Sequence, residues 1–191
     1  MVEKLRVSEV KFAKSMIGMT LPTNKDGHAG RFVEEIFNTA GMKVNRGAGV
    51  DLPAYDLEIK SREITATSAH TIADMSVDDI IAIDYKNSPV YEKIQRQFRV
   101  HTKDNVVVSA EVYDFSSLHI QHLIELAYEH ARQQLIQNPG LTYTPYIGFY
   151  GYFEKVSGHT TLSFRMTTGD MRTLERMTKS NYKNLFSEGT V

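Results

Sequence analysis

The sequence predicts a mixed α/β fold in which a β-sheet is flanked by helices. Segments with helical spacing occur near the start, in the middle and near the end of the chain. A group of short β-like segments lies between the first helices and the long central one, and another pair follows it. This order is typical of a sheet covered by helices on at least one face. A length of 191 residues and an apolar fraction of 41% further predict one domain, residues 1–191, with one hydrophobic core.

Two helices are expected in the first part of the chain. Apolar residues at helical spacing predict a helix from Ser8 to Met19, ended by the proline and turn formers of "TLPTNKDG". A second apolar stripe predicts a helix from about Gly30 to Ala40, stopped at Gly41. The β-like segments that follow are "MKVNR", "YDLEIK" and "ITATSAHTIA", and "SVDDIIAIDY" fits either a helix or a strand.

The second half of the chain contains clearer signals. A brief helix is expected to start at Ser88, with Pro89 in its first turn, and "FRVHT" and "NVVVSAEVYDF" flank the polar "KDN" as a hairpin. A long helix is predicted from about Ser116 to Gln137, where "NPG" ends it. The strands "YIGFYGYFEKV" and "TTLSFRM" come next, followed by a helix near residues 170–178. The aromatic residues of the first of these strands favour core packing, with a platform for stacking nucleic-acid bases as the alternative.

Composition narrows the possible functions. The chain has no cysteine, which excludes disulfides, thiolate nucleophiles and thiolate zinc sites and fits a cytoplasmic location. Its apolar runs are too short for a membrane segment, and its first residues lack the apolar core of a signal peptide. The formal net charge of −1 gives no general attraction to phosphates. Any nucleic-acid binding therefore requires basic residues gathered on one surface.

The most informative stretch is "DLPAYDLEIKSRE", residues 51–63. Leu57 and Ile59 alternate with Asp56, Glu58 and Lys60, so a strand here would bury the first pair and present the other three together on the opposite face. Two interpretations are open. One is a half-exposed strand whose charges neutralise each other, and the other is a metal-ion nuclease site.

The nuclease interpretation follows from the requirements of phosphodiester hydrolysis. Carboxylates must hold Mg²⁺ against the phosphate, and a nearby group must orient or deprotonate the attacking water. Glu58 and Lys60 project from one face of the strand and can serve one phosphate. Asp51 lies beyond Pro53 and can return to the same place from the adjacent turn or strand. Asp56 shares the predicted face of Glu58 and is an alternative ligand.

A second pattern lies on the preceding helix, where "GHAGRFVEE" contains Gly27, Gly30 and Glu34 as G-x-x-G-x-x-x-E. Together with the D-x6-E-x-K spacing of the charged stretch, it resembles the PD-(D/E)xK nucleases. The resemblance is to the MutH-type branch in particular, which comprises the mismatch-repair nicking endonuclease and related type II restriction enzymes. It follows the order of elements over most of the chain, and its specific part is confined to residues 25–62.

The resemblance implies a restriction-endonuclease-like core and a Mg²⁺-dependent endonuclease acting on double-stranded DNA at a short sequence. Asp51 and Glu58 would be the Mg²⁺ ligands together with the backbone carbonyl of Ile59, and Mn²⁺ is expected to substitute for Mg²⁺. Lys60 would position and help activate the water. Glu34 would be an auxiliary acid.

Several points stay open. Glu34 and Glu35 flank the same apolar stripe, so periodicity does not choose between them. The alternative functions are a junction- or branch-specific nuclease on the same core and a DNA-binding module without turnover, and the protein is expected to be a monomer or a homodimer.

Candidates for phosphate or base contacts are basic side chains, which can hold phosphates or guanine edges. They are Arg46, Arg62, Lys86, Lys93, Arg96, Arg99 and Arg165.

The long helix also carries His119, His122 and His130 with Glu125 and Glu129. Their spacing contains neither H-E-x-x-H nor E-x-x-H, the patterns that place metal ligands on one helix face. These side chains are interpreted as the polar flank of an amphipathic helix.

Overall fold

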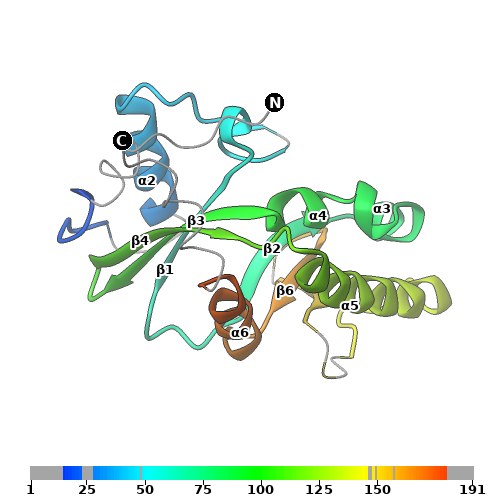
Figure 1. Cartoon of the computed structure of the whole chain (residues 1–191). Coiled ribbons are helices and arrows are strands. Elements are labelled where there is room, and N and C mark those ends of the chain that lie inside the picture. Colours follow the sequence, from blue (N-terminus) through cyan, green and yellow to red (C-terminus); the bar gives the residue numbers. More distant parts are fainter. Residues whose placement is uncertain are drawn as a thin grey trace. The chain divides into compact units, whose positions relative to one another are not determined.

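The computed structural model describes residues 15–22, 28–47, 49–145, 148, 150–156 and 158–179, and Figure 1 shows the course of the chain. The helices are α2 (His28–Thr39), α3 (Val77–Ala82), α4 (Pro89–Ile94), α5 (Leu118–Gln137) and α6 (Thr168–Lys179), with the 3₁₀ turns η1 (Pro53–Tyr55) and η2 (Tyr85–Asn87). The strands are β1 (Glu58–Glu63), β2 (His70–Met75), β3 (Arg96–Lys103), β4 (Val106–Asp114), β5 (Tyr152–Lys155) and β6 (Leu162–Met166).

The predicted α/β class is confirmed, but the described strands form two sheets where the sequence predicted one. One sheet has the order β1-β3-β4 and the other the order β2-β6-β5. The chain correspondingly divides into two compact units, unit 1 (residues 1–66 and 95–113) and unit 2 (residues 67–94 and 114–191). Local patterns reveal which segments are extended but not which of them pair, so this division was not visible in the sequence.

The sheet of unit 1 combines a parallel pair with a hairpin. β1 and β3 are parallel, with Glu58 opposite Gln97 and Lys60 opposite Arg99. β3 continues into β4 through residues 104 and 105, whose φ angles are 52° and 63°. A two-residue hairpin turn with both φ angles positive matches the right-handed twist of its strands, so the predicted hairpin is confirmed.

Helix α2 covers one face of this sheet. Val33 and Phe37 are buried, and the Phe37 ring meets the Phe98 ring edge-on at a centroid distance of 4.9 Å. Gly30 lies over β1, where an added Cβ would stand 3.7 Å from Ser61 Oγ. Side chains alternate along a strand, so Ile59 and Ser61 face α2 while Glu58 and Lys60 lie on the opposite face.

The segment between α2 and β1 differs from the prediction. "MKVNR", residues 42–46, forms no strand, because the Asn45 N–H donates to the Asp51 carbonyl at 2.7 Å and closes a loop. β1 begins only at Glu58, after η1 and after Asp56, whose φ of 50° and ψ of 56° are left-handed. The helix predicted from Ser8 to Met19 falls mostly outside the described residues.

Unit 2 has an antiparallel sheet and a long helix. β6 pairs with both β2 and β5 in antiparallel register. The ambiguous "SVDDIIAIDY" contains the helix α3, capped by the Ser76 hydroxyl, which accepts the Asp79 N–H at 3.0 Å. The predicted helices near residues 116–137 and 170–178 are confirmed as α5 and α6, and the brief helix expected in "SPVYEKIQRQ" is confirmed as α4, which ends at Ile94 before β3 begins at Arg96. Of the helices in the described part of the chain, none is long and apolar enough to cross a membrane.

The core of unit 2 is aromatic. The Tyr128 ring of α5 lies 5.6 Å from Phe153, 5.9 Å from Phe164 and 5.6 Å from Tyr85, measured between ring centroids. All four side chains are almost completely buried. For Phe153, the interpretation of the late aromatic segment as core packing is therefore confirmed, while Tyr146 and Phe149 lie outside the described residues.

Candidate active site

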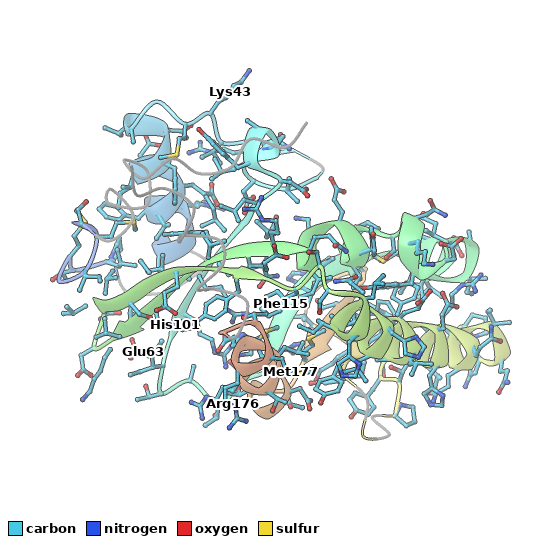
Figure 2. All side chains as sticks on the ribbon, viewed as in Figure 1. Lys43, Glu63, His101, Phe115, Arg176 and Met177 are labelled. Carbon is cyan, nitrogen blue, oxygen red and sulfur yellow. The ribbon has the colours of Figure 1, made fainter. Side chains whose placement is uncertain are left out.

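The predicted catalytic residues come from three neighbouring segments of unit 1. Glu34 lies on α2, Asp51 lies in the loop before η1, and Glu58 and Lys60 lie at the start of β1. The side chains around these elements are drawn in Figure 2. Gly27, which contributed to the sequence pattern, lies outside the described residues.

The chain folds back on itself between Asp51 and β1. Leu52 and Leu57 exchange backbone hydrogen bonds of 2.8 and 3.2 Å on either side of η1. This closed turn brings the Asp51 carboxylate to the beginning of the strand, where its Oδ2 atom accepts the Ile59 N–H at 2.8 Å. This hydrogen bond brings Asp51 to the strand that carries Glu58 and Lys60, as the sequence predicted.

That contact also determines where the Ile59 carbonyl points. β1 is an outer strand of its sheet, and the Ile59 N–H is directed to Asp51. In an extended strand, the N–H and the C=O of one residue point to the same edge. The Ile59 carbonyl is therefore directed to the same edge as the Asp51 carboxylate.

Glu58 and Lys60 form an ion pair on the face away from α2. Lys60 Nζ lies 2.8 Å from Glu58 Oε1, and the Glu58 side chain is only 3% exposed while that of Lys60 is 28% exposed. On the neighbouring strand, Arg99 is also buried and donates to Gln97 Oε1 at 3.1 Å. Glu58 is therefore not solvated, while its pairing with Lys60 is the charge neutralisation that the interpretation of a half-exposed charged strand also expects.

The structure distinguishes the two glutamates of α2. The side chain of Glu34 is 22% exposed and that of Glu35 is 64% exposed. Glu34 lines a pocket of about 440 Å³ that is also lined by Asp51. The described lining residues of this pocket are Arg31, Glu34, Asn45, Arg46, Gly47 and Asp51. The helix therefore directs Glu34, and not Glu35, toward the space next to Asp51.

Asp56 does not continue the strand face as the alternating pattern suggested. It ends η1 in the left-handed conformation, and its N–H donates to the Pro53 carbonyl at 3.3 Å. The alternation begins only with Glu58, so the reason for regarding Asp56 as a substitute ligand is removed.

The predicted metal ligands all offer oxygen atoms, the kind of donor that Mg²⁺ prefers. Within the part of the chain that the structure describes, no group of three or more His, Cys, Asp or Glu side chains could hold a metal ion. Mg²⁺ in nucleotide-processing sites is usually bound by one or two carboxylates, with waters and phosphate oxygens completing its shell. Asp51, Glu58 and the Ile59 carbonyl are the oxygen donors that the sequence predicts for such a set.

The predicted DNA-contacting residues of unit 1 have different surroundings. Arg46 is 63% exposed and lies 3.2 Å from Glu35 and 3.7 Å from Glu34. Arg62 donates to the Ala66 carbonyl at 3.0 Å. Arg96 donates to the Tyr55 carbonyl at 2.7 Å, and Arg99 is buried beside Gln97. Of these four, Arg46 is the exposed one.

In unit 2, Lys86 is 72% exposed and lies 4.0 Å from Glu125, while Lys93 is half-buried. Arg165 is 18% exposed, pairs with Glu154 at 2.6 Å and donates to the Ala69 carbonyl at 3.2 Å. Arg165 thus links three segments of unit 2.

Two pocket side chains were not predicted, those of Arg31 and Asn45. Arg31 precedes Glu34 by one helical turn, and this spacing was a usable signal because such residues share a helix face. Asn45 acts through the closure of its loop, where its side chain donates to the Val50 carbonyl at 3.4 Å. No local sequence pattern predicts such a contact.

The arrangement brings Asp51 to the backbone beside Glu58, places Lys60 on Glu58, and lines one pocket with Asp51 and Glu34. Neither Glu58 nor Lys60 is among the described lining residues of that pocket, so Asp51 is the residue that the described contacts share between the two groups. No protein-family model matches the chain, and no curated protein matches it in sequence. The function of the site is therefore inferred from its residues and their geometry.

Proposed function

We propose that the protein is a Mg²⁺-dependent endonuclease that hydrolyses phosphodiester bonds in duplex DNA. The observation that carries this proposal is the buried ion pair between Glu58 and Lys60, with the Asp51 carboxylate bonded to the intervening residue Ile59. Burying a carboxylate is costly. The pair places an acid and a cation side by side at the point where Asp51 meets the backbone of the same strand.

Each residue has a distinct role in this proposal. When bound, Mg²⁺ would polarise the phosphate and lower the pKa of a coordinated water. Asp51, Glu58 and the Ile59 carbonyl would hold the ion, and Glu34 would act from the pocket wall. Lys60 would orient the attacking water and offset the charge that develops on the phosphate.

The chemistry is the addition of one water across a P–O ester bond. The water oxygen forms a new bond to phosphorus, the bond to the leaving sugar oxygen breaks, and a proton from the water is finally carried by that oxygen. We also propose that unit 1, with α2 against its mixed sheet and the acids at the start of β1, is a restriction-endonuclease-like core. The resemblance to MutH-type enzymes supports cleavage at a short sequence.

The decisive experiment incubates supercoiled plasmid with the protein in Mg²⁺ or in EDTA and compares wild type with Lys60→Ala. Wild type should convert the plasmid to nicked or linear forms only with Mg²⁺. Lys60→Ala should lose cleavage by roughly 100-fold or more, while its DNA affinity stays nearly unchanged, since other phosphate contacts supply most of the binding energy.

Lys43→Ala is the control for the loss of one positive charge, because Lys43 is an exposed lysine of the same unit. It should cleave like wild type. Equal loss of cleavage and binding in Lys60→Ala would contradict the role of Lys60. Binding without cleavage by wild type would favour a DNA-binding module, and cleavage confined to branched substrates would favour a structure-specific nuclease.

A further inference from the structure

Arg46 occupies an unusual position in the pocket of unit 1. Its Nη2 atom lies 3.2 Å from Glu35 Oε2 and its Nε atom 3.7 Å from Glu34 Oε2. The same guanidinium lines the pocket together with Asp51. A cation that belongs to the chain therefore stands beside an acid that would otherwise attract a metal ion.

The acids of the site are balanced in different ways. Asp51 accepts a backbone N–H, and Glu58 accepts the Lys60 ammonium within the same strand. Glu34 is balanced by Arg46, which comes from the irregular segment after α2 and is 63% exposed. An exposed ion pair is weak and can be exchanged at little cost, in contrast to a buried one.

We infer that Arg46 is a displaceable counter-ion of the pocket: it neutralises Glu34 in the metal-free protein, competes with a divalent cation, and turns to a DNA phosphate once the cation is bound. This inference rests on the proposed function, because it concerns the same cation and the same polyanion. Metal binding frees Arg46 to contact DNA, and DNA binding draws Arg46 away from Glu34. Each of the two binding events therefore strengthens the other.

The charge argument fixes the sign of the effect. A positive guanidinium next to Glu34 repels a doubly charged cation and must be moved away for the cation to use that carboxylate. Removing the charge of Arg46 should tighten Mg²⁺ binding in the absence of DNA, by about three- to tenfold for a largely solvent-exposed group.

The test is calorimetric titration of the DNA-free protein with MgCl₂ at low salt. Arg46→Gln should bind Mg²⁺ about three- to tenfold more tightly than wild type. Lys43→Gln is the matched control, because Lys43 is an exposed cation three residues earlier whose side chain extends outward in Figure 2. It removes the same charge and should change the affinity less than about twofold.

A double-mutant cycle tests whether Arg46 acts through Glu34. Glu34→Gln should weaken Mg²⁺ binding, and adding Arg46→Gln to it should give little further change. Unchanged or weaker Mg²⁺ binding by Arg46→Gln, or an equal gain in Lys43→Gln, would overturn the inference. So would failure of wild type and both single-charge variants to bind Mg²⁺ at all.

The proposed contact between Arg46 and DNA is tested in the Lys60→Ala background, so that the DNA is not cleaved during the measurement. The log-log dependence of DNA affinity on NaCl should be steeper when Arg46 is retained than after Arg46→Gln. The two slopes should differ by the amount expected for about one phosphate contact when Mg²⁺ is present, and by clearly less in EDTA. An equal difference in both conditions would overturn the coupling.

Because these readouts require binding and not turnover, a wild-type protein that binds Mg²⁺ and DNA but never cleaves would refute the proposed function and leave this inference standing.

Discussion

Unit 1 and unit 2 each contain a three-stranded sheet and a helix packed on it or beside it, yet they use buried polar groups differently. In unit 2 these groups connect elements that are distant in sequence. The Tyr85 hydroxyl donates to Gln121 at 2.8 Å, and the Tyr128 hydroxyl donates to the Ile83 carbonyl at 3.0 Å. Such neutral bonds satisfy buried polar atoms and hold the fold together.

The buried acid of unit 1 has a charged partner instead. Glu58 pairs with Lys60, two positions along the same strand. Glu63, at the other end of β1, provides a contrast within the strand. Its carboxylate accepts the Thr102 hydroxyl at 2.9 Å and the Asp104 N–H at 3.1 Å, and so supports the hairpin turn. The contacts of Glu63 support the hairpin, whereas the proposed function gives Glu58 a role in metal binding.

The largest expected effect concerns these two acids. Glu58→Gln should reduce cleavage by roughly 100-fold or more, while the thermal midpoint of the metal-free protein rises. The rise is expected because a buried charge is removed and Lys60, which is 28% exposed, can turn to water. Melting curves with and without Mg²⁺ measure this, and the ion should stabilise wild type more than the variant.

Glu63→Gln is the matched control in the same strand. It should keep cleavage and lower the thermal midpoint, since it weakens the acceptor of the hairpin bonds. If Glu58→Gln cleaves normally and Glu63→Gln does not, the contrast between the two ends of β1 is wrong.

The next effect separates the two glutamates of α2. Glu34→Ala should slow cleavage by about tenfold, because Glu34 lines the pocket beside Asp51. Glu35→Ala should have little effect on the rate, since that side chain is 64% exposed. Single-turnover rates on one plasmid substrate provide the comparison. A slower Glu35→Ala enzyme beside a normal Glu34→Ala enzyme would reverse the assignment.

Sequence reasoning succeeded where the signal was local. The helix from about Gly30, the hairpin around residues 104–105 and the long helix α5 each follow from apolar spacing and turn formers that act within a few residues. The E-x-K pair is likewise a property of one strand. These features needed no knowledge of the pairing between distant segments.

The rest depended on contacts between segments. Backbone pairing between segments sets the separation of the strands into two sheets, the loop at residues 42–46 and the left-handed Asp56. The spacing of apolar residues, every two in a strand or every 3.6 in a helix, does not reveal such pairing. The pairing of Arg46 with the acids of α2 arises in the same way, because α2 and the segment after it meet only in the folded chain.

A smaller effect is expected from alkaline pH on the aromatic core of unit 2. Burial raises the pKa of Tyr128 to about 12, and burial also raises the pKa of Tyr85. An unfolded tyrosine ionises near pH 10, so between about pH 10 and 12 the unfolded chain releases protons that the folded chain retains. The free energy of unfolding is therefore fully present below pH 10 and falls as the pH rises through this window.

Thermal midpoints at about pH 8, 10 and 11 measure this decline. Tyr128→Phe should make the decline shallower, although it also removes the bond to the Ile83 carbonyl and lowers the midpoint at pH 8. Tyr143→Phe is the control, because Tyr143 is 46% exposed, and it should leave the slope unchanged. A decline of the same steepness in Tyr128→Phe would show that this hydroxyl is not the group that ionises late.

The smallest effect concerns the ion pair of unit 2. Arg165 Nη1 lies 2.6 Å from Glu154, and Arg165 also donates to the Ala69 carbonyl. The pair joins neighbouring strands and is partly exposed, at 18% and 36%. Glu154→Gln should therefore lower stability by only about 0.2–1 kcal/mol and leave the cleavage rate unchanged.

Chemical denaturation of Glu154→Gln beside Glu58→Gln completes the comparison, since both variants replace the acid of an ion pair by the same neutral amide. We expect opposite outcomes, with a modest loss of stability and full activity at Glu154, and no loss of stability with lost activity at Glu58. Loss of stability without loss of activity in both variants would mean that Glu58, like Glu154, serves the fold. The distinction between a structural acid and a catalytic one would then fail at the residue on which the proposed function depends.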